Sequence, residues 1–359
     1  MAASLAEKRS ARVIQYEWFR LFATAFVVLG HSAYWVINTA NGGVYFGADE
    51  FSWIAPAYFS NFFDAARTAA NGVYRFHMAA FFFLSGAVLR LRPIGAAGPF
   101  LLKKARRLLV PYYLCGLLWM LPVKYLAGFY KTHALPAALG NFLLGGSDSG
   151  HLWFLPVLFL CMALFALLET LCSSCEARKG IAFVPLLAGL LLRYATPQLQ
   201  SFLLQQFALY FFWFSLGWAV EPLRAAVARW EEQNNKNLLM PVAVGFAALS
   251  ALWKLPLAGF VAAAVGCAWC MLLGALCTRL FPKAGQTALF SALSRQTFCV
   301  YLLHDPLEHL LLRVCMQNRV LATAAGCWAY LLLRTVGVFA LCVAAGELWR
   351  RQRLVKNKK

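Results

Sequence analysis

Residues 16–37 read YEWFRLFATAFVVLGHSAYWVI, an apolar stretch long enough to cross a bilayer as a single helix. The stretch nevertheless contains Glu17, Arg20 and His31. Charged and titratable side chains are costly inside a membrane, so they usually face the protein interior and carry function. At about 100° per residue, Arg20 and His31 lie about 20° apart around the helix, and Glu17 lies about 40° to the other side of His31. The stretch therefore predicts a transmembrane helix with one functional stripe.

The composition is that of an integral membrane protein. Of the 359 residues, 62% are hydrophobic and 13% are charged, whereas soluble domains average about 45–50% apolar and about 25% charged residues. No stretch is polar enough for long enough to form a separate soluble domain, so we expect one membrane domain over residues 1–359. The lipid bilayer is then its first partner.

The formal net charge is +19, from 33 Lys and Arg against 14 Asp and Glu. A basic balance can indicate nucleic-acid binding, but no nucleic-acid motif occurs in the sequence, and we predict no such partner. In a membrane protein, basic residues gather in cytoplasmic loops beside anionic lipid. We therefore interpret the charge as a signal of topology.

Apolar windows predict an all-α bundle of about ten transmembrane helices. When the segment 1–14 is placed in the cytoplasm, most Lys and Arg residues fall in inner loops, and the basic tail 349–359 is also cytoplasmic. Both termini are then inside. The predicted windows are 15–38, 73–91, 107–128, 151–172, 180–195, 205–222, 238–254, 257–281, 288–313 and 323–348.

The cysteine pattern gives no metal or disulfide framework. Two CxxC patterns occur, Cys172–Cys175 and Cys267–Cys270, and the second lies inside a predicted span. They are far apart in sequence, and free cysteine in an apolar run behaves as a small buried hydrophobe. We predict no metal site.

Five segments, in order, resemble those of the acyltransferase-3 family of membrane O-acyltransferases. Arg20, ten residues and then His31 is similar to the family's Arg/Lys-x10-His motif. One departure is Ala79-Ala80, where the family often has Pro-Leu. The other four segments are RFHMAAFFFLSGAVL from residue 75, KKARRLLVPYYL from 103, HLWFLPVLFL from 151 and VYLLHDPLEHLL from 300.

The resemblance implies a ten-helix enzyme that moves an acyl group, expected to be acetyl, from acyl-coenzyme A to a hydroxyl. The donor would arrive from the cytoplasm, and the acceptor would be a cell-surface carbohydrate or its lipid-linked precursor. By the same analogy the protein is expected in a bacterial inner membrane. His31 would be the essential residue. Acyl transfer to a hydroxyl needs a base, and imidazole titrates close to neutral pH. A covalent acyl-histidine is the alternative.

Cations near the inner end of the first span are candidates for donor binding, because guanidinium groups bind phosphate bidentately. We predict that Arg20 orients the donor. Glu17 either pairs with Arg20 or acts directly. An inner phosphate-binding patch is predicted at Lys103, Lys104, Arg106 and Arg107, for which the alternative is the positive-inside rule alone.

Further candidates open the second span at the outer side. Arg75 could stabilise the developing oxyanion or bind the acceptor, or it could snorkel to the interface. His77 is a second acceptor-side candidate. Ser85-Gly86 in the same span is more typical of a close helix contact than of a nucleophile.

Two later segments carry the remaining candidates. His151 and Trp153 could contact the acceptor, and Trp153 could stack on a sugar or anchor the interface. His304 is predicted to pack or to lie on the acceptor side. Arg334 is expected to pair with an acid such as Glu308 or Glu347.

The main rival hypothesis is a transporter or exporter of a polysaccharide precursor, whose intramembrane charges would line a substrate path. It predicts transport without coenzyme A dependence. A second rival is another membrane acyl-transfer family with a buried histidine. A sensor is disfavoured, because the chain has no soluble signalling domain.

Overall fold

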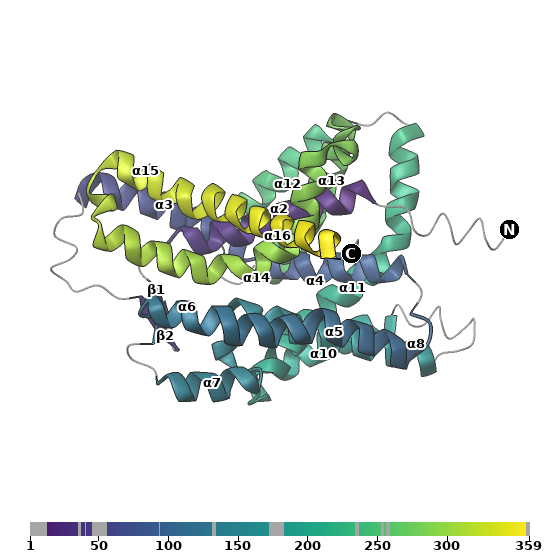
Figure 1. Ribbon diagram of the computed structural model, residues 1–359. Helices are drawn as coiled ribbons and strands as arrows, with labels where there is room; N and C mark the ends of the chain where they lie inside the picture. The colour runs from purple at the N-terminus through teal and green to yellow at the C-terminus, as the bar shows by residue number, and fades with distance from the viewer. Residues whose placement is uncertain are drawn as a thin grey trace. The chain divides into compact units, whose positions relative to one another are not determined.

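The computed structural model describes residues 13–34, 37–39, 41–44, 56–92, 94–130, 134–171, 183–233, 237–252, 255 and 259–356, and most of these are helical (Figure 1). The Cys172–Cys175 pattern, most of the segment 1–14 and the last three residues of the tail lie outside the described residues. Cys267 and Cys270 are free thiols buried in a helix.

Helices account for nearly all of the regular structure. In chain order, the α-helices and strands are α2 (Ile14–Ser32), β1 (Ile37–Thr39), β2 (Gly42–Val44), α3 (Pro56–Tyr74), α4 (His77–Arg90), α5 (Ala97–Cys115), α6 (Leu121–Leu126), α7 (Leu135–Leu143), α8 (Phe154–Leu171), α10 (Phe183–Ala195), α11 (Phe202–Gln233), α12 (Leu239–Leu252), α13 (Gly259–Leu280), α14 (Ala288–Gln317), α15 (Ala324–Leu332) and α16 (Val338–Lys356).

Each of the ten predicted windows overlaps at least one helix, and the all-α prediction is confirmed. Among the described residues, six helical stretches are long and apolar enough to cross a membrane. The chain is therefore a multi-pass membrane protein. These stretches are Asp64–Arg90, Ala97–Leu126, Ser147–Thr170, Phe202–Arg224, Gly259–Leu280 and Ala324–Arg353.

The first helix is shorter than the predicted window. We expected a span over 15–38, but α2 ends at Ser32, and residues 37–39 form strand β1 of a small antiparallel hairpin with β2. Ile37 pairs with Val44, and Thr39 with Gly42. The helix ends where Arg334, far along the chain, donates hydrogen bonds to the carbonyl oxygens of His31 and Ser32.

The chain divides into two compact units, each assembled from separate segments. The first comprises Met1–Arg20, Arg75–Tyr112 and Trp153–Ala284, and the second comprises Leu21–Tyr74, Tyr113–Leu152 and Gly285–Lys359. Helices α2 and α5 each run from one unit into the other.

In the first unit, α4 and α11 approach closely through glycine. A Cβ on Gly86 would overlap the carbonyl oxygen of Phe214, and a Cβ on Gly217 would overlap that of Phe83. The prediction that Ser85-Gly86 marks a close helix contact is therefore confirmed. Small residues permit such backbone approach between membrane helices.

In the second unit, α14 packs against α16 and α6. Val28 of α2, Val300 of α14 and Val338 and Cys342 of α16 form one buried cluster. A second cluster surrounds Leu312 at the far end of α14. The apolar packing thus fixes α14 between the end of α2 and the last helices of the chain.

Two π-helical turns interrupt the helices of the second unit, η2 (Gly116–Met120) before α6 and η8 (Leu333–Gly337) between α15 and α16. Single π-helical turns within helices often occur at functional sites. Lys124 follows η2, and Arg334 lies within η8.

Candidate active site

A cavity of about 570 Å³ lies within the second unit. Its wall is built by the end of α2, the β-hairpin, the end of α3, α6 and the turn after it, the 3-10 segment η3 (Ser147–Trp153), α14 and η8. Both aromatic and polar side chains line it. They are His31, Tyr34, Ile37, Thr39, Asn41, Tyr74, Lys124, Phe129, Tyr130, Ser147, Asp148, Gly150, His151, Asp305, Glu308, His309 and Arg334.

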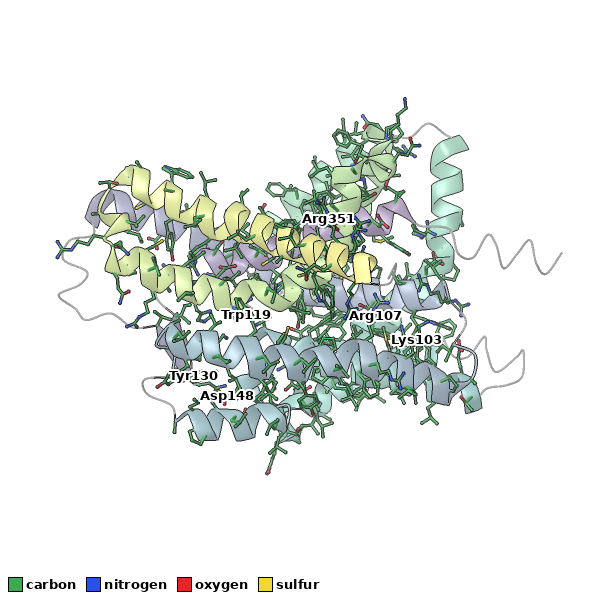
Figure 2. All side chains as sticks on the ribbon, in the orientation of Figure 1. Lys103, Arg107, Trp119, Tyr130, Asp148 and Arg351 are labelled. Carbon is green, nitrogen blue, oxygen red and sulfur yellow. The ribbon has the colours of Figure 1, made fainter. Side chains whose placement is uncertain are left out.

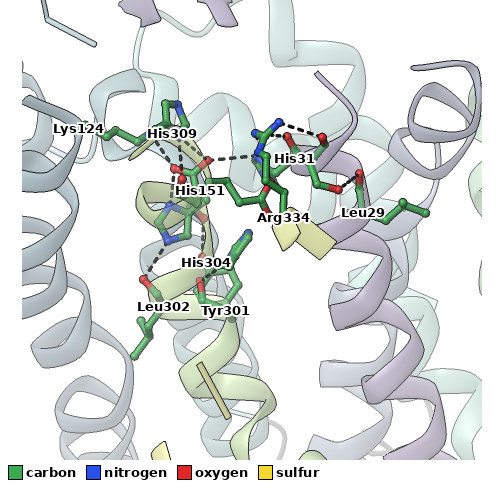
Figure 3. Close-up of polar contacts among 12 residues, drawn as sticks. Leu29, His31, Lys124, His151, Tyr301, Leu302, His304, His309 and Arg334 are labelled. Atoms are coloured by element: carbon green, nitrogen blue, oxygen red, sulfur yellow. Dashed lines mark hydrogen bonds and ion pairs between the residues drawn. The ribbon is translucent and has the colours of Figure 1, made fainter. Parts of the chain in front are cut away.

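Asp305 is the centre of a group of polar contacts with four basic side chains. These partners, His31, Lys124, His151 and His309, are labelled in Figure 3. Oδ1 of Asp305 lies 3.2 Å from Nδ1 of His31. Its Oδ2 lies 2.8 Å from Nζ of Lys124 and 3.1 Å from Nδ1 of His151. Nδ1 of His309 is farther, at 3.7 Å from Oδ1. A buried carboxylate is tolerated when it is paired and hydrogen-bonded, and this one has partners at both oxygens.

Pro306 explains how His151 reaches this cluster. Proline has no N–H, so in a helix it leaves the carbonyl four residues earlier without its usual donor. In α14 that carbonyl belongs to Leu302, and it lies 3.2 Å from Nε2 of His151. The ring of His151 therefore bridges Leu302 and Asp305, and it ties η3 to α14.

His304 lies beneath the cluster rather than on the cavity wall. Its Nδ1 lies 3.0 Å from the carbonyl oxygens of both Val300 and Tyr301, so this nitrogen carries the proton. The ring is fully buried and sits edge-on to His31 and His151, with ring centroids 5.2 and 5.1 Å apart. His304 is therefore packed against His31 and His151, and its predicted acceptor-side role stays a prediction.

His31 is the most open member of the cluster. Its side chain is 27% exposed, against 3% for Asp305. A carboxylate at Nδ1 favours the neutral tautomer that carries its proton there, which leaves the lone pair on Nε2. Nδ1 of His309 likewise faces an acceptor, the carbonyl oxygen of Asp305 at 2.7 Å, but the His309 side chain is only 6% exposed. His31 is therefore the histidine best arranged to act as a base or nucleophile.

Lys124 lines the cavity and was missed by sequence reasoning, because nothing in the sequence distinguishes it from the rest of the 33 Lys and Arg residues. It is 5% exposed, and its ammonium group lies 4.9 Å from the ring centroid of Phe129. Gly150, with φ +51°, leaves room for it: a Cβ there would lie 3.0 Å from Nζ. The role of Asp305 was also missed, although its occurrence in an apolar segment was a signal.

Arg334 and Glu308 form a buried pair, with Nη2 3.4 Å from Oε2. This confirms the prediction that Arg334 pairs with an acid, and it selects Glu308. The other acid that was considered, Glu347, instead accepts hydrogen bonds from Arg295, Gln296 and Arg350.

Tyr130 and Asp148 lie at the side of the cavity where α6 ends (Figure 2). Burial raises the pKa of the Tyr130 phenol, and the nearby carboxylates of Asp148 and Asp305 raise it further. Tyr130 is therefore a neutral phenol, able to donate or accept a hydrogen bond at the cavity.

The remaining predicted residues belong to the first unit and do not line the cavity. Glu17 and Arg20 lie in the first half of α2, so one helix does carry them together with His31. The predicted phosphate patch lies on α5, where Lys103, Arg106 and Arg107 are exposed (Figure 2 labels Lys103 and Arg107). Lys104 is half-buried, and its ammonium lies over the ring of Phe100.

Arg75 contacts the end of α12. Its Nη1 donates to the carbonyl oxygens of Leu252 and Leu255, at 3.2 and 2.9 Å. His77 is buried at the start of α4. Trp153 lies in an aromatic cluster, with ring centroids 6.2 Å from Phe82 and 5.2 Å from Tyr210.

Within the residues that the structure describes, no three His, Cys, Asp or Glu side chains are arranged to hold a metal ion.

The site thus combines an imidazole paired with a carboxylate and a cavity of about 570 Å³. The sequence model of the acyltransferase-3 family, described as an acyltransferase domain, matches residues 13–347. No curated protein and no solved structure matches the chain. Because the family match covers nearly the whole chain, the protein belongs to the acyltransferase-3 family and is a multi-pass membrane acyltransferase.

Proposed function

We propose that the protein transfers an acyl group, expected to be acetyl, from acyl-coenzyme A to a hydroxyl of a cell-surface carbohydrate or its lipid-linked precursor. The observation that carries this proposal is the pair of His31 and Asp305 on the wall of the cavity. The family assignment favours acyl transfer over the exporter hypothesis.

In the proposed reaction, Nε2 of His31 removes the proton of the acceptor hydroxyl as its oxygen attacks the thioester carbonyl. A carbon–oxygen bond forms and the carbon–sulfur bond breaks. The departing thiolate of coenzyme A then takes the proton from the imidazolium. Asp305 holds the imidazole in the required tautomer and stabilises its positive charge, and Lys124 balances the charge of Asp305 in the resting site.

A covalent acyl-histidine is the other route that the same atoms allow. Nε2 would then attack the thioester, coenzyme A would leave, and the acceptor hydroxyl would displace the histidine in a second step. The two routes differ in one observable. Without acceptor, only the covalent route accumulates protein that is heavier by one acyl group.

For the donor, we propose that Arg20 and the exposed cations of α5 contact the phosphates of coenzyme A. Lys103, Arg106 and Arg107 lie three and four residues apart, so they share one face of α5. Substituting all three by Gln should raise the KM for acyl-coenzyme A more than it lowers kcat. Topology alone would predict no change in KM.

For the acceptor, we propose that the cavity holds a sugar. Tyr34, Tyr74, Phe129 and Tyr130 offer aromatic surface, while Asn41, Ser147 and Asp148 offer polar groups. Sites for small molecules commonly combine apolar walls with a few polar groups that fix orientation. Among the predicted acceptor contacts, His151 lines this cavity, and His77, Trp153 and His304 remain predictions.

The proposal also includes about ten spans in a bacterial inner membrane, with both termini cytoplasmic. The concentration of Lys and Arg in alternate loops supports this orientation. The donor patch on α5 would then face the cytoplasm, where acyl-coenzyme A is made.

The experiment that tests the function is acyl transfer by the purified protein in nanodiscs. Labelled acyl-coenzyme A donors of different chain length would be supplied with a glycan extract. Label that enters the glycan and requires both substrates supports the proposal. Vesicle uptake of an unmodified glycan precursor without coenzyme A, together with no label transfer, would favour the exporter.

A further inference from the structure

The backbone at the end of α2 is held by one distant side chain. The last carbonyls of a helix have no donor within the helix. Nη2 of Arg334 donates to the carbonyl oxygen of His31 at 3.1 Å, and Nη1 donates to that of Ser32 at 2.9 Å. Nη1 also donates to the carbonyl oxygen of Tyr34. One guanidinium thus contacts three carbonyls around His31.

Arg334 is itself held on two sides. Its side chain is fully buried, and Glu308 of α14 lies 3.4 Å from Nη2. Tyr330, one turn earlier, places its ring 4.9 Å from the guanidinium carbon and contacts Nη1 through its hydroxyl. The Tyr330 hydroxyl also donates to the carbonyl oxygen of Tyr34 at 2.6 Å. A buried guanidinium is costly without such partners.

Helix α14 therefore holds both the ring and the backbone of His31. Asp305 of α14 contacts the ring directly, and Glu308, three residues later, reaches the backbone of His31 through Arg334. Residues three apart share a helix face. We propose that Arg334, anchored by Glu308, is a positioning residue that keeps the His31 ring aligned with Asp305. The inference rests on the proposed function of His31.

Arginine is required because of its shape. A guanidinium presents five N–H donors in a rigid plane, whereas the lysine ammonium is a compact point charge on a flexible stem. Arg334→Lys keeps the charge opposite Glu308 but cannot reach all three carbonyls at once. The substitution therefore tests alignment with little change in charge.

Kinetics give the first test. Arg334→Lys should lower kcat about 100-fold, the scale of a misplacement of about 1 Å, and change the KM for acyl-coenzyme A less than about twofold. The matched control is Arg193→Lys, because Nη1 of Arg193 donates to the carbonyl oxygen of Leu209 away from the cavity. This control variant should keep the wild-type kcat. An unchanged kcat in a folded Arg334→Lys protein would overturn the proposal.

A double-mutant cycle separates positioning from general stability. If Arg334 acts by aligning His31 with Asp305, Arg334→Lys should cost little once Asp305→Asn is present. If the double variant instead loses kcat by the product of the two single-variant factors, the effect of Arg334 is independent of Asp305, and the inference is contradicted. Tyr330→Phe removes the hydroxyl that contacts Arg334, and it should lower kcat by a smaller factor than Arg334→Lys does. It replaces Arg334→Lys in this test if that variant does not fold.

A third readout does not need turnover. Hydrogen exchange by mass spectrometry should become faster in the peptide containing His31 in Arg334→Lys, and stay at the wild-type rate in Arg193→Lys. If wild-type protein transfers no acyl group, the proposed function fails while exchange still tests whether Arg334 holds the end of α2. Unchanged exchange in Arg334→Lys would overturn that contact.

Discussion

Nδ1 of His31 lies 3.2 Å from Oδ1 of Asp305, and the two residues come from opposite ends of the chain. The carboxylate is almost fully buried, while the ring lies partly open on the cavity wall. A buried acid behind an accessible imidazole is the arrangement that sets a histidine tautomer for acid–base or nucleophilic chemistry. The family motif contains His31, but the fold supplies its partner.

Asp305→Asn should lower kcat by at least about 100-fold, because the amide no longer stabilises an imidazolium at His31. The KM for acyl-coenzyme A should change little, since the side chains that Asp305 contacts among the described residues line the cavity, away from the proposed donor patch on α5 in sequence. Steady-state label transfer in nanodiscs measures both constants. Retention of more than half of wild-type kcat would contradict the assigned role.

This variant leaves Lys124 buried beside a neutral side chain. Breaking a buried pair by removing one partner costs about 3–5 kcal/mol, so Asp305→Asn should also lower the unfolding temperature. Adding Lys124→Met removes the unpaired cation and should recover part of that stability without recovering activity. Recovery of activity along with stability would mean that Asp305 acts only through folding.

Gly150→Ala tests the packing around Lys124. Its Cβ would lie 3.0 Å from Nζ of Lys124 and 3.1 Å from Sδ of Met120, at a backbone φ of +51°. Such backbone conformations cost a non-glycine residue about 1–3 kcal/mol. We expect lower stability and about a tenfold loss of kcat, because Lys124 must shift from Asp305.

The control for that prediction is Gly95→Ala. Gly95 also has a positive φ, +67°, but a Cβ there would meet no atom within 4 Å. It should lose stability and keep kcat, as measured by thermal unfolding and label transfer on the same samples. Equal losses of kcat in the two variants would show that backbone strain, rather than contact with Lys124, is responsible.

Much of the helical framework could be predicted, because apolar windows and positive charge patterns are local in sequence. The end of α2 could not. The composition of residues 33–38 remains apolar, and the helix stops where Arg334 and Tyr330 contact the backbone. Likewise, strands β1 and β2 have three residues each and are too short to give a strand pattern.

The site was predictable only in part for the same reason. A titratable residue within an apolar span, such as His31, stands out without a structure. The meeting of His31, Lys124 and Asp305 depends on contacts between remote segments, so the sequence alone does not single out Lys124 among the basic residues. Proline usually interrupts a helix, yet α14 continues through Pro306, and the carbonyl of Leu302 contacts the distant His151 instead.

Gly86→Ala should destabilise the first unit strongly, because its Cβ would overlap the carbonyl oxygen of Phe214 and backbone cannot move aside like a side chain. Overpacking typically costs about 1–3 kcal/mol and sometimes more. Gly98→Ala in α5 is the control, since no atom lies within 4 Å of its Cβ. Thermal unfolding in detergent should separate the two, and equal unfolding temperatures would contradict the close contact of α4 and α11.

The most direct test is acyl transfer by His31→Ala, compared with wild type in nanodiscs at matched folding and with the same donor and glycan extract. Loss of a general base typically costs about 10²–10⁴-fold, so the variant should fall to that level or to background. Added imidazole should restore part of the rate. A folded His31→Ala protein that transfers label at the wild-type rate would contradict the assignment of His31 as the reacting residue.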